Sequence, residues 1–231
     1  MRHFVGAACG LWVACALPAQ AEPVVVVELF TSQGCSSCPP ADAFLQTLTG
    51  DPRIIPLSLH VDYWDYIGWA DSFASPEFTK RQKAYARAAG AKMIYTPQMI
   101  VGGVERVEGN APDELAYHLA NHLAAPAQVT LVLERKGDVL VIRADADPPL
   151  TAPVRIQLVR YLPEETVEIQ RGENAGKVVT YHNIVTSWDN LGDWAGTAPL
   201  EVSAPVTGSQ PAVVIVQEEG PAAILAAARV D

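Results

Sequence analysis

The segment Glu28-Leu-Phe-Thr-Ser-Gln-Gly-Cys-Ser-Ser-Cys-Pro-Pro40 spaces two cysteines, Cys35 and Cys38, as C-x-x-C. It continues an apolar, β-branched run at 24–30, which is typical of a buried strand, and it precedes helical spacing at 41–48. Two thiols about one helical turn apart can form a disulfide and exchange it with a partner. Thiol–disulfide chemistry is therefore the leading hypothesis for the function.

The elements expected after this segment complete an alternating pattern. We expect a strand at 54–61, a helix at 76–89, short strands at 98–101 and 104–107 around Gly102-Gly103, and a helix at 111–125. A strand, a helix and a second strand form a βαβ unit, and a C-x-x-C pair beside such a unit is typical of a thioredoxin-like fold. We predict an α/β thioredoxin-like domain over residues 22–125.

After Ala124-Ala-Pro-Ala127, apolar and polar residues begin to alternate, as they do along half-buried strands. A hairpin is expected at 129–135 and 139–144, and further strands at 154–162, 166–170, 177–184, 212–217 and 223–230. Several short strands with turn signals between them are typical of a sandwich. We predict a small antiparallel β-sandwich-like domain over residues 126–231.

The N-terminal residues have the pattern of an export signal. A short basic start precedes an apolar run at 4–17, and Ala19-Gln-Ala21 has the small residues of a cleavage site. The apolar run is shorter than the roughly 20 residues that a membrane span needs. We predict a signal peptide over 1–21, a periplasmic or secreted protein, and no stable membrane insertion.

Cys9 and Cys15 lie within this predicted signal, so the mature chain would keep Cys35 and Cys38 alone. Lipid attachment at Cys15 is the less favoured alternative, because Trp12 stands where such sites have an aliphatic residue. An exported protein meets an oxidising compartment, where a lone cysteine pair rests as a disulfide or is kept reduced by a partner.

The chain is acidic, with a formal net charge of -10 at pH 7. Loss of Arg2 with the signal would make it one unit more negative. Such a charge gives no electrostatic reason to bind nucleic acid or an anionic membrane surface. We expect neither as a partner.

The helix after the cysteines suggests a role for each thiol. At a helix N-terminus, backbone N–H groups and the helix dipole lower a thiol pKa, so Cys35 is the expected nucleophile and Cys38 the resolving thiol. Glu28 lies seven residues before Cys35 on the predicted strand. It is a candidate proton shuttle for the resolving step, and the alternative is an exposed acid near a strand end.

Three residues are candidates for substrate binding. Thr96-Pro97 precedes a short strand, and a cis-proline there would let Thr96 pair with a substrate strand. Trp64 belongs to an aromatic segment at 62–75, which would form either a peptide-binding rim or the internal packing of a long insertion.

Two other functions remain open. Cys35, Cys38 and His60 could hold a soft ion such as Cu(I), in the manner of a metallochaperone, although a hydrogen-bonded histidine beneath the aromatic segment is the simpler interpretation of His60. No second C-x-x-C is present to complete a four-cysteine zinc site. The third hypothesis is a noncatalytic binding module whose disulfide staples a loop.

Four motifs together resemble a domain-of-unknown-function (DUF) family of exported bacterial proteins. They are the cysteine segment extended to Asp42, His60-Val-Asp-Tyr-Trp-Asp65, Tyr95-Thr-Pro-Gln98 and Tyr181-His-Asn183. The resemblance implies a thioredoxin-like domain with a β-rich extension and paired Cys35 and Cys38, but no substrate.

These observations favour an exported thiol–disulfide oxidoreductase-like protein whose direction and substrate stay open. It would need no cofactor, and its partners would be protein thiols or disulfides, with a membrane electron donor as one source of electrons.

Overall fold

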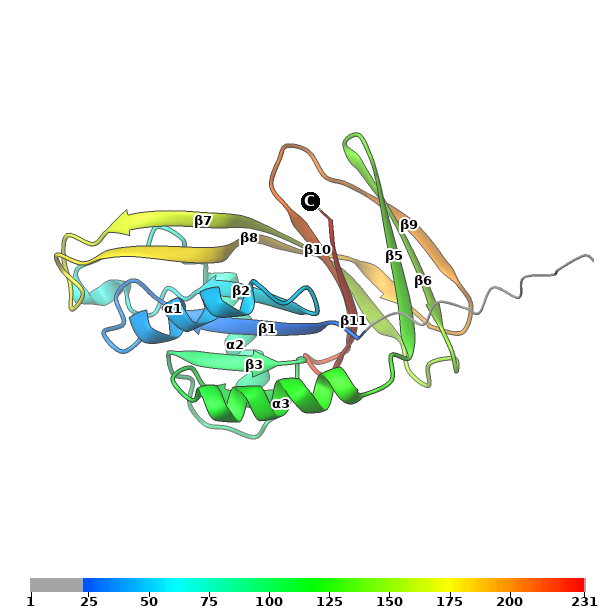
Figure 1. Ribbon diagram of the computed structural model, residues 1–231, viewed down its shortest axis with the longest axis horizontal. Coiled ribbons are helices and arrows are strands. Elements are labelled where there is room, and N and C mark those ends of the chain that lie inside the picture. The colour runs from blue at the N-terminus through cyan, green and yellow to red at the C-terminus, as the bar shows by residue number, and fades with distance from the viewer. Residues whose placement is uncertain (1–22, 231) are drawn as a thin grey trace, which may run out of the picture.

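Apolar, β-branched residues form the two central strands of the fold. The strands β1 (Val25–Thr31) and β2 (Ile54–His60) are buried along their whole length and run parallel, with Thr31 opposite His60 at their ends. They lie inside an eight-stranded sheet of order β11-β10-β7-β8-β2-β1-β3-β4, and their complete burial shows that both of their faces are covered. The protein, seen here in a computed structural model that describes residues 23–230, is a mixed α/β fold built on this sheet (Figure 1).

The remaining elements follow in chain order. They are α1 (Pro39–Leu48) between β1 and β2, then η1 (Asp65–Ile67), α2 (Pro76–Ala88), β3 (Gln98–Val101), β4 (Glu105–Glu108), α3 (Pro112–Ala124), β5 (Val129–Lys136), β6 (Val139–Ala146), β7 (Val154–Glu168), β8 (Val178–Trp194), β9 (Leu200–Pro205), β10 (Ala212–Glu218) and β11 (Ile224–Val230). The order strand, helix, strand, helix, strand, strand, helix that was predicted for 22–125 is confirmed.

The alternation of side chains along β1 separates the helices onto two faces. Val27 and Leu29 pack in one core with residues of α1 and α3, whereas Val26 and Phe30 pack in another with Phe78 of α2. Successive side chains of a strand point to opposite faces, so α1 and α3 cover one face and α2 the other (Figure 1). Residue 28 therefore faces α2, and residue 31 faces α1.

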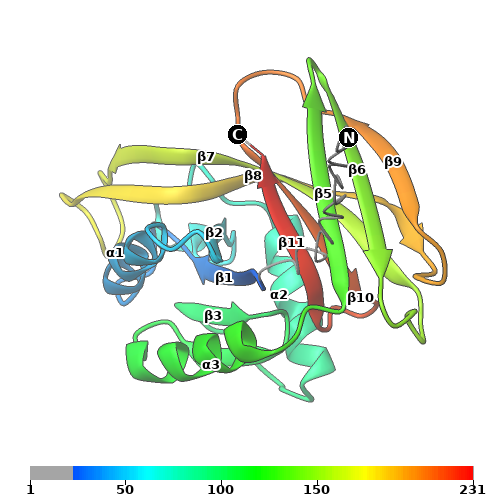
Figure 2. The same cartoon turned by 45° about the vertical axis from the view of Figure 1, so that its right-hand side comes forward.

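The large sheet continues across the predicted domain boundary. Four strands that follow residue 125 join it, because β8 pairs parallel with β2 at Ser58 and Ile184, and β7, β10 and β11 follow outward. The sandwich expected over 126–231 is therefore not a separate sheet pair. The strands β5, β6 and β9 form a second sheet that packs against the outer part of the large one, where Leu140 and Ile142 share a core with Val214 (Figure 2).

Some strands differ from their predicted bounds. The runs at 154–162 and 166–170 form one strand, β7, and the run at 177–184 continues to Trp194 in β8. Register shifts interrupt this long pair at two points, which lets it bend without ending. The sequence pattern did not predict β9.

The predicted signal at 1–21, with Cys9 and Cys15, lies outside the described residues. Within residues 23–230, no helix has the length and apolar character needed to cross a bilayer.

Candidate functional site

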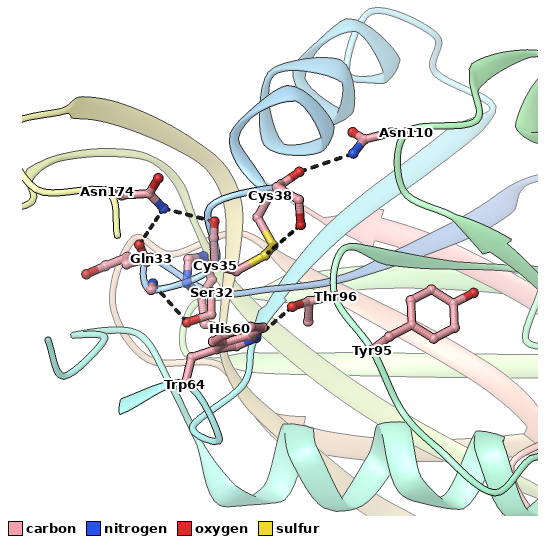
Figure 3. Close-up of a disulfide and its surroundings, with 12 residues drawn as sticks. Ser32, Gln33, Cys35, Cys38, His60, Trp64, Tyr95, Thr96, Asn110 and Asn174 are labelled. Atoms are coloured by element: carbon pink, nitrogen blue, oxygen red, sulfur yellow. Dashed lines mark hydrogen bonds between the residues drawn. A yellow bond between two sulfur atoms is a disulfide. The ribbon is translucent and has the colours of Figure 1, made fainter. Parts of the chain in front are cut away.

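Cys35 and Cys38 are joined by a disulfide in the turn that precedes α1 (Figure 3). The N–H of Cys38 donates to the carbonyl oxygen of Cys35 at 3.2 Å, which closes the turn around Ser36 and Ser37. Both cysteines are fully buried. The Cys35 Sγ atom lies 3.5 Å from the Ser37 hydroxyl oxygen.

The helix α1 begins at Pro39, two residues before the predicted helical spacing at 41–48. Cys38 is its N-cap, and Pro39 and Pro40 contribute no N–H groups. The first helical N–H groups, those of Ala41 and Asp42, donate to the Cys38 carbonyl oxygen at 2.9 and 3.0 Å. In the disulfide form these N–H groups therefore do not donate to Cys35 Sγ, and the stabilisation of a Cys35 thiolate by the helix N-terminus stays a prediction. The Ser37 hydroxyl is the polar group that contacts this sulfur instead.

The Thr96–Pro97 peptide bond is cis, as predicted, and lies against the start of α1. The N–H of Gly109 donates to the Pro97 carbonyl oxygen at 3.0 Å. A Cβ atom on Gly109 would lie 2.5 Å from Pro97 Cβ and 3.1 Å from Ala41 Cβ. Glycine at position 109 thus allows the segment before β3 to approach the first turn of the helix.

Trp64 and Thr96 lie in contact, and Trp64 also packs partly against the core. The Trp64 indole N–H donates to the Thr96 hydroxyl at 2.7 Å, and the 81% exposed ring of Tyr66 stacks on Trp64. Neither the backbone N–H nor the carbonyl of Thr96 has a hydrogen-bond partner within residues 23–230. This backbone and the aromatic pair form an open edge on which an extended segment could pair.

Glu28 is fully buried, but the structure does not bring it to the disulfide. Its carboxylate faces α2, where it accepts hydrogen bonds from Arg81 at 2.6 and 2.9 Å and from the Tyr85 hydroxyl at 2.6 Å. The Arg81 guanidinium carbon lies 3.7 Å from the centre of the Trp188 ring. The sheet therefore separates Glu28 from Cys38, and the residue serves a buried ion pair.

Asp42 is a buried acid in the first turn of α1. It follows Cys38 by one helical turn, and residues four apart lie on the same helix face. Neither carboxylate oxygen has a hydrogen-bond partner of normal geometry in the described part of the chain. Burial raises the pKa of Asp42 to about 7, although the charge of His60 and the nearby Thr31 hydroxyl oppose this rise.

His60 lies on the same face, at the end of β2. Its Nδ1 atom is 2.7 Å from Oδ2 of Asp71, and both side chains are fully buried. Asp71 also accepts a hydrogen bond from the Gln33 N–H at 2.8 Å. Burial alone would raise the pKa of Asp71, but the charge of His60 and the hydrogen bonds to this carboxylate hold it below its ordinary value.

His60 Nε2 has no hydrogen-bond partner among the described residues, and the hydroxyls of Thr31 and Ser58 on the same face also lack one. His60 packs edge-on against Phe73 and Tyr181. Residues 23–230 contain no group of three or more His, Cys, Asp or Glu side chains arranged to hold a metal ion. The copper hypothesis for Cys35, Cys38 and His60 thus gains no support from the geometry.

Asn174 also belongs to this site, and sequence reasoning did not identify it. It lies in the loop between β7 and β8, and its side-chain amide donates to the carbonyl oxygens of Gln33 and Cys35, both at 2.9 Å (Figure 3). It is 139 residues from Cys35, so no local spacing could connect the two.

Comparison with known proteins gives a family and two similar structures. Residues 26–217 match the family described as "Protein of unknown function (DUF1223)". A crystal structure of an Agrobacterium tumefaciens protein is 33% identical, with a TM-score of 0.78 over 92% of this chain and 96% of that chain. The HBP35 protein of Porphyromonas gingivalis is 14% identical, with a TM-score of 0.62 over 90% of this chain and 75% of its own, which shows a similar fold alone. No curated protein matches the sequence.

Proposed function

The chain belongs to the DUF1223 family of proteins of unknown function, and from the geometry of its site we propose that it is an exported thiol–disulfide oxidoreductase acting through Cys35 and Cys38. The direction of electron flow depends on how the reduction potential of this cysteine pair compares with the reduction potentials of its partners.

The topology of the N-terminal half supports a thioredoxin-like domain for residues 22–125. The strands β2, β1, β3 and β4 are adjacent in that order; β1 and β2 are parallel, and β3 is antiparallel to both of its neighbours. The position of α1 and α3 on one face and of α2 on the other supports the same proposal.

One observation carries the functional proposal: the disulfide stands at the start of α1, the helix turn that the Thr96–Pro97 segment approaches and that carries the buried carboxyl group of Asp42. The open edge can align a partner polypeptide by β-strand pairing. A carboxyl group with a pKa near neutrality can give up or accept a proton during exchange. A disulfide that only staples a loop needs neither feature.

The site can oxidise a partner dithiol in two balanced steps. A partner thiolate attacks Cys35 Sγ, which forms a mixed disulfide, breaks the Cys35–Cys38 bond and leaves Cys38 as a thiolate that takes the proton of Asp42. The second thiolate of the partner then attacks the partner sulfur of the mixed disulfide. The partner leaves as a disulfide, and Cys35 leaves as a thiolate. The same steps in reverse reduce a partner disulfide, with Cys38 losing its proton to Asp42.

We place the protein in the periplasm or outside the cell, on the pattern of residues 1–21. Its partners there would be protein thiols and disulfides, with a membrane electron donor supplying electrons if it acts as a reductase. Mass spectrometry of the protein isolated from its native host tests this proposal, because signal cleavage would leave a chain that begins at Glu22.

The decisive experiment traps the mixed disulfide. A Cys38→Ser variant cannot resolve the intermediate and should accumulate partner proteins bound to Cys35, released by dithiothreitol, whereas Cys35→Ser should trap none. The wild-type protein should also accelerate disulfide exchange in a model protein substrate. No trapped partner and no acceleration in either direction would leave the noncatalytic binding module as the better interpretation.

A further inference from the structure

Two loops from distant parts of the chain cover the disulfide. The first is the segment between β2 and α2, which contains Trp64 and Ile67. Cys35 has no exposed surface, and a Cβ atom on the preceding Gly34 would lie 3.1 Å from Trp64 Cβ and from the side chain of Ile67. The second loop, residues 169–177 between β7 and β8, packs on the first, because a Cβ atom on Gly172 would lie 3.4 Å from Trp69 Cβ. Both loops therefore enclose the turn that carries the cysteines.

The loop at 169–177 is closed by its own hydrogen bonds. The N–H groups of Ile169 and Gly176 donate to the carbonyl oxygens of Lys177 and Ile169 at 2.9 and 2.7 Å, and the N–H of Ala175 donates to Gly172 at 3.2 Å. These bonds do not depend on the cysteine turn. The loop can therefore move away as a unit and keep its internal structure.

Asn174 supplies the hydrogen bonds that tie this loop to the cysteine turn. Its buried amide group donates to Gln33 and Cys35, while Lys177 Nζ donates to Asn174 Oδ1 at 2.7 Å and so holds the amide in this orientation. Opening the loop breaks these two hydrogen bonds, and within residues 23–230 no other side chain of the loop donates to the cysteine turn.

We propose that Asn174 is a specificity-determining residue that keeps the loop at 169–177 closed over the Cys35–Cys38 disulfide, so that the disulfide reacts with polypeptide partners in preference to small thiols. The inference rests on the proposed function. A polypeptide held along Thr96 and the Trp64–Tyr66 pair has binding energy with which to displace the loop, whereas a small thiol must wait for spontaneous opening.

The experiment measures the rate at which dithiothreitol reduces the disulfide of the full-length mature protein, by quenching with a thiol-trapping reagent. Asn174→Ala should raise this rate about fivefold or more, since it removes two hydrogen bonds that favour the closed loop. Lys177→Met keeps the amide and should raise the rate less. Asn110→Ala is the matched control, because Asn110 donates to the Ser37 carbonyl oxygen at 3.1 Å but lies outside the loop, and its rate should stay near that of the wild type.

Equal rates for Asn174→Ala, Asn110→Ala and the wild type would overturn the proposal. An increase in the reduction rate that merely follows a loss of global stability would also overturn it. Urea unfolding of each variant detects such a loss, and Lys177→Met is a milder change that guards against it. The result is independent of the trapping experiment. A disulfide that never exchanges with proteins can still be shielded by this loop, and a true oxidoreductase can have an unshielded one.

Discussion

Replacement of Asp42 by asparagine should change how stability depends on pH. The pKa of Asp42 rises from 3.8 to about 7 on folding. Between these values the folded protein holds a proton that the unfolded chain has lost, so this group makes stability fall as pH rises. At 1.36 kcal/mol per pKa unit, the full shift corresponds to about 4 kcal/mol, an upper value for a single buried site.

Urea unfolding of wild-type protein and Asp42→Asn, measured from about pH 4 to about pH 8, tests this reasoning. The buried amide of the variant has a cost that does not depend on pH, so the change in the stability difference is the quantity of interest. That difference should move in favour of the variant with rising pH, by up to about 4 kcal/mol, and then level off. His60 and Asp71 are present in both proteins, and Asp113→Asn, at an exposed acid in the first turn of α3, controls for the loss of a helix-terminal charge. A stability difference that stays constant across this range would refute the assignment of Asp42 as a buried acid that ionises near neutrality.

Two further changes test the buried contacts on either face of the sheet. Arg81→Met should lower the free energy of unfolding by about 3–5 kcal/mol, because it leaves the Glu28 carboxylate buried without its cation, and adding Glu28→Gln should recover part of the loss in the same urea titration. Gly109→Ala should lower the free energy of unfolding by about 1–3 kcal/mol, because the added Cβ would overlap Pro97. It should also slow disulfide exchange with a protein substrate, because the overlap would displace Thr96. Unchanged stability and an unchanged exchange rate would show that the close approach at Gly109 is not needed.

The sequence was sufficient for the parts of the fold that local patterns determine. Helix bounds in residues 22–125 are right to within a few residues because caps and prolines mark them, as Ser75 and Pro76 do for α2. The pairing of β2 with β8 joins Ser58 to Ile184, and no local pattern carries information about a partner so far along the chain. β9 was missed because its residues are mostly exposed or half-buried and form a short, weak pattern.

The same limit explains why the sequence did not show that Glu28 faces away from the cysteines and that Asp42 is buried near them. β1 is apolar on both faces, so its sequence does not show which face Glu28 occupies. The sequence gives no sign that Asp42 is buried, because the helix dipole alone favours an acid in the first turn of a helix. Its burial follows from strands packed beneath α1, one of which, β8, begins more than a hundred residues later.

The C-terminal half is therefore part of the candidate site. β8 supplies the parallel neighbour of β2 and places Tyr181 against His60, while the loop before it carries Asn174 to the Cys35 carbonyl oxygen. Without residues 126–231, the apolar edge strand β2 would be open to pairing with other chains, and the polar groups beneath α1 would lose part of their cover. The chemistry proposed for Cys35 and Cys38 thus draws on the whole sheet, because β8, which packs against α1 and helps to bury Asp42, and the loop at 169–177 both come from the half of the chain that lacks the cysteines.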